Sequence, residues 1–136
     1  MSRIDSNVRA AIDDLRHPDW GMRLIAAQAL GVYGTAAAAA VPALSDRIGD
    51  VDWMVGVAAV DALGSIGVAA ETAVPRLMAA LTALNVHPDV SAAAADALMA
   101  IGNPSAVPAL RDAWLNARDA KVRQAAAQAL GHFLPK

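Results

Sequence analysis

The sequence predicts an all-α fold, a right-handed α-solenoid (superhelix) of helical hairpins with about seven helices. Of the 136 residues, 57% are apolar but only 4% are aromatic, because most of the apolar residues are alanine. Alanine and leucine favour helices, and the β-branched and aromatic residues that favour strands are sparse. A Val-Pro step also recurs at a spacing of 33 residues. A repeat of this length, with helical periodicity inside each unit, is typical of solenoids.

The Val-Pro steps open one set of predicted helices. Apolar residues follow each of these three valines, and also Val8, which stands 33 residues before the first of them, at offsets of three and seven, which mark one face of a helix. The four stripes are Val8, Ala11, Leu15; Val41, Leu44, Ile48; Val74, Leu77, Leu81; and Val107, Leu110, Trp114. Proline is tolerated in the first turn of a helix, so Pro42, Pro75 and Pro108 should mark helix starts. The alanine tract before Val41 is then a connector.

A second set of helices alternates with the first. Its segments share an Ala-Leu step, as in "AAQALGVYG" (26–34), "AVDALGSIG" (59–67), "AADALMAIG" (94–102) and "AAQALGHF" (126–133). Asp19, Asp52 and Asp119 precede these segments, where a short acceptor caps the first-turn amides. Gly34, Gly67 and Gly102 follow three of them, where a left-handed residue ends a helix.

These elements predict a single domain over residues 1–136. We expect a capping helix at about 4–16, three repeats at about 19–50, 52–86 and 88–117, and a terminal helix at about 120–134. Both terminal helices carry polar residues, which predicts capped ends and a complete chain.

The motifs "VPAL", "VPRL", "DAKVR", "DWGMR" and "AAxALGxxG" resemble the HEAT-like repeat family, in the short form first associated with phycobilisome lyases, over about residues 4–134. The third unit departs from the pattern, with Ser91 at the arginine position and Met99 in place of glycine. The resemblance implies the solenoid fold and says little about function. One branch, the deoxyhypusine hydroxylases, binds iron through His-Glu pairs, and this sequence has none. Bilin lyases handle tetrapyrroles with similar repeats, which leaves a lyase-related chain as an alternative.

Composition excludes several kinds of chemistry and localisation. Without cysteine there is no disulfide, thiolate metal site or thiol nucleophile. The net charge is -2 and the basic residues Arg111, Arg118, Lys121 and Arg123 form only a local cluster, so we expect no nucleic-acid partner. The N-terminus does not resemble a secretory signal. Prolines and aspartates interrupt the apolar stretches, so we expect no membrane span and a cytoplasmic protein.

No catalytic or metal-binding constellation is evident. His17 and His87 both lie in "HPD" but two units apart, roughly 20 Å at ordinary helix spacing, and a turn before a helix explains each. The sequence has no nucleophile motif and no phosphate-binding loop. Asp61 and Asp96, which share one helix position with Gln28 and Gln128, are explained by a solvated flank. We therefore expect no enzyme activity, no metal and no cofactor.

Two surfaces are candidates for binding a partner. The first lies on the Val-Pro helices, which we expect on the concave side; its residues are Asp13, Asp46, Arg47, Arg76 and Asp112. Such a broken acidic row among alanines suits a peptide or helix with basic and small apolar residues, and an ordinary solvated face is the alternative.

The second candidate is an apolar patch on the other set of helices. Trp20 and Trp53 are one period apart, and Leu24 and Val57 follow one turn later. Exposed tryptophan is a preferred anchor for binding partners. Alternatively, the tryptophans fold over the turns between units and help to pack them.

The function predicted from these observations is a non-catalytic scaffold or adaptor that binds a protein segment on its concave face. A phycobilisome-lyase-like chain and a self-assembling homo-oligomer are the alternatives. Two substitutions test the predicted packing: Leu63→Ala should be costly because Leu63 is expected in the core, and Gly56→Ala should be mild if Gly56 faces solvent.

Overall fold

The computed structural model describes residues 2–135, all of them in helices, turns or short connections. Eight α-helices and three 3-10 helices follow one another: α1 (Arg3–Asp14), α2 (Trp20–Tyr33), η1 (Gly34–Ala40), α3 (Val41–Arg47), α4 (Trp53–Ile66), η2 (Gly67–Ala73), α5 (Val74–Thr82), α6 (Pro88–Ile101), η3 (Pro104–Ala106), α7 (Val107–Asn116) and α8 (Ala120–Phe133). The all-α solenoid is confirmed. The expected number of about seven helices is one too low, because a single helix, three pairs and a final single helix amount to eight.

The predicted N-caps are confirmed. The side chain of Asp19 accepts a hydrogen bond from the Gly21 amide at 2.9 Å, that of Asp52 from the Met54 amide at 2.9 Å, and that of Asp119 from the Lys121 amide at 2.8 Å. Each bond satisfies an amide that the first helical turn leaves without a backbone partner. These caps fix where α2, α4 and α8 begin.

The predicted glycine helix ends are also confirmed. Gly34, Gly67 and Gly102 have φ values of 57°, 74° and 78°, the positive range that side chains with a Cβ avoid. After Gly34 and Gly67 the chain continues as the 3-10 helices η1 and η2, so the alanine tract is a short helical connector. The prolines of α3, α5 and α7 lie in the first turn, as expected.

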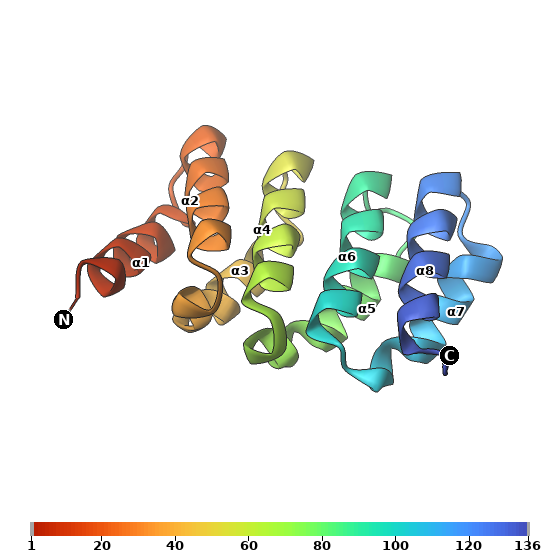
Figure 1. Ribbon diagram of the computed structural model, residues 1–136. Coiled ribbons are helices and arrows are strands. Elements are labelled where there is room, and N and C mark those ends of the chain that lie inside the picture. The colour runs from red at the N-terminus through yellow and green to blue at the C-terminus, as the bar shows by residue number, and fades with distance from the viewer. Residues whose placement is uncertain (1, 136) are drawn as a thin grey trace.

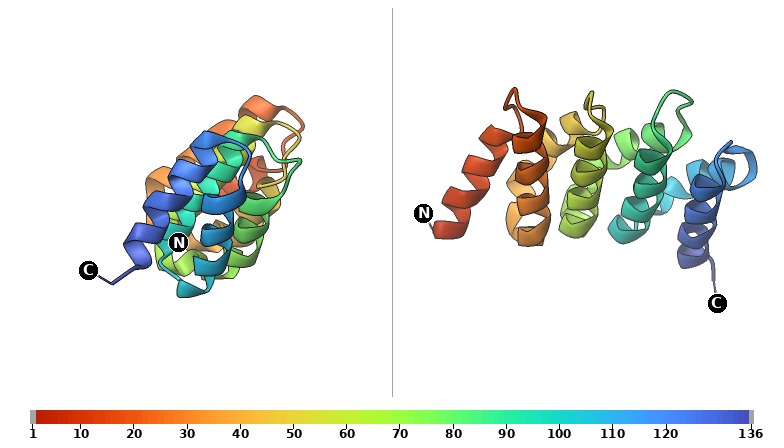
Figure 2. Two further views of the ribbon diagram at one scale, coloured as in Figure 1. Left: turned by 90° about the vertical axis from the view of Figure 1, so that its right-hand side faces the viewer. Right: turned by 90° about the horizontal axis from the view of Figure 1, so that it is seen from above.

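The helices form two layers. Figure 1 shows α2, α4, α6 and α8 side by side in chain order, and the view from above in Figure 2 shows the Val-Pro helices behind them. We call α2, α4, α6 and α8 the first layer and α1, α3, α5 and α7 the second layer.

Neighbours in the first layer approach one another closely. A Cβ built on Gly31 would lie 3.5 Å from the Ala62 Cα, and one on Gly64 would lie 3.3 Å from the Ala97 Cα. In the second layer, by contrast, α3 contacts α5 only sparsely. A two-layer stack curves towards the layer with the closer spacing, so the first layer forms the inner side. The Val-Pro helices form the outer side, contrary to our expectation that they line the concave face.

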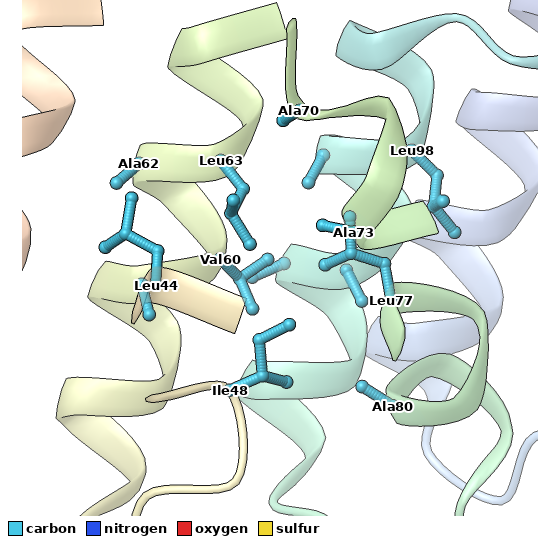
Figure 3. Packing of buried hydrophobic residues seen from close by; sticks show 14 of the residues in the cluster. Leu44, Ile48, Val60, Ala62, Leu63, Ala70, Ala73, Leu77, Ala80 and Leu98 are labelled. Atoms are coloured by element: carbon cyan, nitrogen blue, oxygen red, sulfur yellow. The ribbon is translucent and has the colours of Figure 1, made fainter. Parts of the chain in front are cut away.

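One continuous core runs between the layers. Figure 3 shows leucines from successive elements, Leu44, Leu63, Leu77 and Leu98, meeting between the helices, and each is at most 1% exposed. Small residues such as Ala62, Ala70 and Ala73 fill the space around them and are also buried. Leu63 is therefore a core residue, as expected, and each repeat packs mainly on its neighbours.

Two stretches, Trp20–Arg47 and Trp53–Thr82, are long and apolar enough to pass a membrane-span test, with a mean hydropathy of 1.6 over 18 residues. Each is a helical hairpin and not one rod, because the chain turns at Gly34 and Gly67. The longest helix within either stretch has 14 residues, or about 21 Å, shorter than the roughly 30 Å of a bilayer core. The stretches are therefore weak evidence for a membrane protein.

Candidate functional site

A groove of about 400 Å³ lies between α2 and α4 on the inner layer. Its lining residues are Leu24, Gln28, Trp53, Met54, Val57, Ala58 and Asp61. Three of the four residues of the predicted apolar patch, Leu24, Trp53 and Val57, are thus brought together. The fourth, Trp20, is partly exposed but is not among the lining residues.

Trp53 forms a fixed wall of this groove. Its ring stacks on the imidazole of His87, with ring centroids 4.1 Å apart and planes inclined by 6°. His87 is held in turn, because its Nδ1 accepts the Asp89 amide at 3.1 Å and so caps α6. The alternative that a tryptophan folds over the turn between units therefore applies to Trp53. One face of the indole packs on the His87 ring, and the Trp53 side chain remains partly exposed.

One carboxylate lines the groove, and a second lies one repeat away. Asp61 on α4 lines the groove, and Asp96 occupies the same position on α6. Burial raises the pKa of both carboxyl groups above the ordinary value, and the charge of Asp96 further raises the pKa of Asp61. Neither forms an ion pair with any of residues 2–135. A cation brought by a ligand would stabilise the charged form of both.

The predicted charged row lies on the outer layer and is not uniformly acidic. Asp46 and Arg76 form an ion pair at 2.9 Å between α3 and α5, with both side chains more than half exposed. Asp112 accepts a hydrogen bond from the Asn116 side chain, and Asp13 is exposed. The Arg47 guanidinium lies 3.3 Å from the Asp50 carboxylate, in the loop before α4. Whether this row binds a partner stays a prediction.

A buried ion pair that the sequence analysis missed joins α2 to the start of α4. The guanidinium of Arg23 donates two hydrogen bonds to the Asp50 carboxylate, at 2.8 and 3.0 Å, and two more to the His17 and Pro18 carbonyls. The Asp50 side chain is only 1% exposed.

The pKa of Asp50 reflects this setting. Burial alone would raise the pKa, but hydrogen bonds from Arg23 and the Asp52 amide, with the nearby arginine charges, outweigh burial and lower it. Arg23 stands at the arginine position of the family motif, which was the available signal for its role. Asp50 lies outside the repeated stripes, so its pairing with Arg23 could not be inferred from the period.

The arginine position is Arg in α2 and α8, Gly56 in α4 and Ser91 in α6. Arg123 donates to the Ala117 and Arg118 carbonyls, as Arg23 does to the loop before its own helix. Ser91 donates a single hydrogen bond to the Ala80 carbonyl at 2.9 Å. Gly56 is buried, and a Cβ there would lie 3.0 Å from the Ile48 carbonyl oxygen. The premise that Gly56 faces solvent is therefore wrong, and Gly56→Ala should be destabilising.

His17 and His87 have structural roles in the turns, as the sequence analysis expected for the two "HPD" motifs. His17 Nδ1 accepts the Asp19 amide at 3.0 Å, as His87 does for Asp89. Within residues 2–135 no three His, Asp or Glu side chains are grouped so that they could hold a metal ion.

Comparison with known families agrees with this architecture. The sequence profile of HEAT repeats matches residues 8–85 and 68–131, which together span most of the chain. The chain belongs to the HEAT repeat family. This match is to HEAT repeats in general, so it gives no support to the narrower resemblance to phycobilisome lyases. No curated protein sequence matches the chain significantly.

Two solved structures are similar to this HEAT repeat chain. Human deoxyhypusine hydroxylase in complex with glycerol has a TM-score of 0.75 and 26% identity, over 98% of this chain and 44% of that one. An engineered protein has a TM-score of 0.69 and 24% identity, over 97% of this chain and 62% of that one. The chain thus spans less than two thirds of either. Since one of the two is an enzyme, the expectation of no catalysis stays a prediction.

Proposed function

We propose that this HEAT repeat chain is a protein-binding scaffold that holds a partner segment in the groove between α2 and α4. The observation that carries this proposal is an apolar groove lined by Asp61, which has no ion-pair partner among residues 2–135, with Asp96 one repeat away. Leu24, Met54 and Val57 supply apolar surface, and the stacked Trp53 supplies a rigid wall. Rigid aromatic anchors bind with little loss of side-chain entropy.

The charge of the groove indicates the chemistry of the partner. Asp61 and Asp96 lie one repeat apart on the inner layer; both residues are exposed, yet partial burial of the carboxyl groups raises their pKa, so the charged forms carry a desolvation cost. A Lys or Arg of the partner would relieve this cost, whereas an acidic segment would be repelled. The expected partner is therefore a helical or extended segment with apolar residues followed by basic ones.

Of the two surfaces predicted from the sequence, the groove is the better supported. The outer row already satisfies part of its charge internally, through Asp46–Arg76 and Asn116–Asp112. A partner there would have to compete with these contacts. At the groove it would find the Asp61 carboxylate, which no side chain of residues 2–135 pairs.

The proposal is tested by binding synthetic amphipathic peptides, one with lysines beside its leucines and one with glutamates in their place. Isothermal titration should detect the lysine peptide and not the glutamate peptide. The double variant Asp61→Asn/Asp96→Asn should bind the lysine peptide at least about tenfold more weakly, which corresponds to roughly 1.4 kcal/mol.

Asp112→Asn is the matched control, because it removes an exposed carboxylate from the outer layer. It should leave the affinity unchanged. Weakening by Asp112→Asn instead of the double variant would move the site to the outer face. Equal binding of both peptides, or of neither, would contradict the proposed groove chemistry. Crosslinking in a cell extract through a photoreactive group at residue 57 would then identify the natural partner.

A further inference from the structure

The N-terminal end of the inner layer exposes a face that the interior helices bury. The four helices α2, α4, α6 and α8 each have 14 residues, so their positions correspond one to one. Ile25 on α2 is 60% exposed, whereas its counterparts Ala58, Ala93 and Ala125 are each at most 8% exposed. Ala29, one turn further on, is also less buried than its counterparts. In the other repeats this face packs on the preceding helix.

The C-terminal end of the inner layer shows the complementary face. Ala127 on α8 is exposed, although its counterparts on α2, α4 and α6 are fully buried. A Cβ built on Gly131 meets no atom of residues 2–135 within 4 Å outside its own stretch of helix backbone, whereas the counterparts Gly31 and Gly64 meet the backbone of the next helix. A glycine inside a helix costs about 1 kcal/mol relative to alanine, and close helix packing offsets this cost only where a neighbour is present.

The outer layer shows the same pattern at both ends. Trp114 on α7 is 48% exposed, against 9% for Ile48 and 3% for Leu81 at the same position of earlier repeats. Ile4 on α1 is 46% exposed, while its counterparts Ala37 and Ala70 are fully buried. Both ends of the stack therefore expose apolar side chains where another repeat would cover them.

We propose that copies of this chain stack end to end, with α8 of one copy packed on α2 of the next. Gly131 would then meet Ala29 of the second copy in the way that Gly31 meets Ala62 and Gly64 meets Ala97. The α1 helix of the second copy would stand beside α8 and complete the repeat that α8 begins. The contact continues an interface that occurs three times within the chain, between α2, α4, α6 and α8.

The residues of the two faces suit such a contact. Met22, Ile25 and Ala29 on one face, and Gln124, Ala127 and Gly131 on the other, are uncharged, so the contact of α8 with α2 places no charge among these residues. The two faces differ from each other, which makes the contact heterologous and able to repeat from copy to copy. This association uses the ends of the stack and leaves the α2–α4 groove open, so it does not depend on the proposed function.

Sedimentation velocity on the 136-residue chain over a range of concentrations tests the stacking. The average mass should rise with concentration. Ile25→Arg and Gly131→Arg should each raise the concentration needed for association by at least about tenfold, since each places a charge in an apolar contact. Neither position packs tightly within the chain, and circular dichroism with thermal unfolding should show that both variants fold.

An equimolar mixture of the two variants gives the decisive result. Each variant retains one intact face, so the mixture should form a complex of two chains although each variant alone is monomeric. Val32→Arg is the matched control, because Val32 is exposed on α2 at a position that is exposed in every repeat. A wild-type chain that stays monomeric at all concentrations would overturn the proposal. So would an association that Ile25→Arg leaves intact and that Trp20→Ala abolishes.

Discussion

The junction before α4 and the junction before α6 connect equivalent helices but are held together differently. At residues 48–52, Asp50 accepts hydrogen bonds from Arg23, Arg47 and the Asp52 amide, so the loop is fixed to α2 and to its own helix. The junction at residues 83–87 has Ser91 where α2 has Arg23. Ser91 makes one hydrogen bond, to the Ala80 carbonyl. A hollow of about 210 Å³ opens there between the ends of α5 and α7.

The comparison shows that the repeats share their helices and differ in their junctions. The helices that follow the two junctions are equally well buried, since Leu63 on α4 and Leu98 on α6 are both nearly inaccessible. The ion pair of Arg23 with Asp50 ties α2 to the start of α4, and these are the two helices that form the groove. The better-fixed junction therefore supports the surface to which we assign partner binding, and a fixed groove loses less entropy on binding.

The largest expected effect is that of Asp50→Ala. This substitution leaves the Arg23 guanidinium in the junction without its carboxylate, and breaking a buried ion pair in this way costs about 3–5 kcal/mol. Chemical denaturation should show this fall in the free energy of unfolding. The matched control Asp46→Ala breaks the exposed pair with Arg76 and should cost less than about 1 kcal/mol. Equal costs for the two variants would mean that Asp50 does not close the junction.

Leucine truncation at equivalent positions compares the buried cores of α4 and α6. Leu63→Ala and Leu98→Ala each remove a fully buried side chain and should cost about 2–5 kcal/mol. The two costs should be similar, because both leucines are nearly inaccessible and neither lines the hollow at the start of α6. Equilibrium unfolding of both variants in urea measures the difference. A clearly smaller cost at Leu98 would show that the looser junction also loosens the core behind it.

Ser91→Ala should have a smaller effect. It removes the single hydrogen bond to the Ala80 carbonyl, and one such bond contributes about 1 kcal/mol. Thermal unfolding should show a correspondingly small decrease in Tm. A loss as large as that of Asp50→Ala would show that the serine holds its junction as firmly as the ion pair holds the other.

Acid should remove the stability that Asp50 gives to the junction before α4. The folded pKa of Asp50 lies below the ordinary value of 3.8, so its carboxylate stabilises the fold above pH 3.8 and this contribution is lost as the pH falls through the folded pKa. Asp50→Asn should therefore be less stable than the wild type at neutral pH and equally stable in strong acid. Thermal unfolding at a series of pH values checks this, and a gap that persists in strong acid would exclude the carboxylate as its cause.

The sequence predicts the features that recur and misses those that occur once. Period, stripes and caps predicted the helices, because the same physical requirement acts in every repeat. The Arg23–Asp50 pair joins a recurring position to a unique one, so no periodicity reveals it. Gly56 was misjudged because its burial depends on how closely the Ile48 carbonyl approaches α4. The patch of Trp20, Leu24, Trp53 and Val57 was predicted as a unit, but Trp53 stacks on His87 and Trp20 does not line the groove.

Residue-resolved hydrogen exchange of the native chain tests most directly whether one junction is fixed and the other loose. The Asp52 amide donates to the Asp50 carboxylate at 2.9 Å, whereas Leu84 and Asn85 are exposed and their amides donate no hydrogen bond within residues 2–135. The account predicts a protected Asp52 amide, fast exchange at Leu84 and Asn85, and loss of the protection at Asp52 in Asp50→Ala. Equal exchange at the two junctions, or protection confined to residues 83–87, would contradict it.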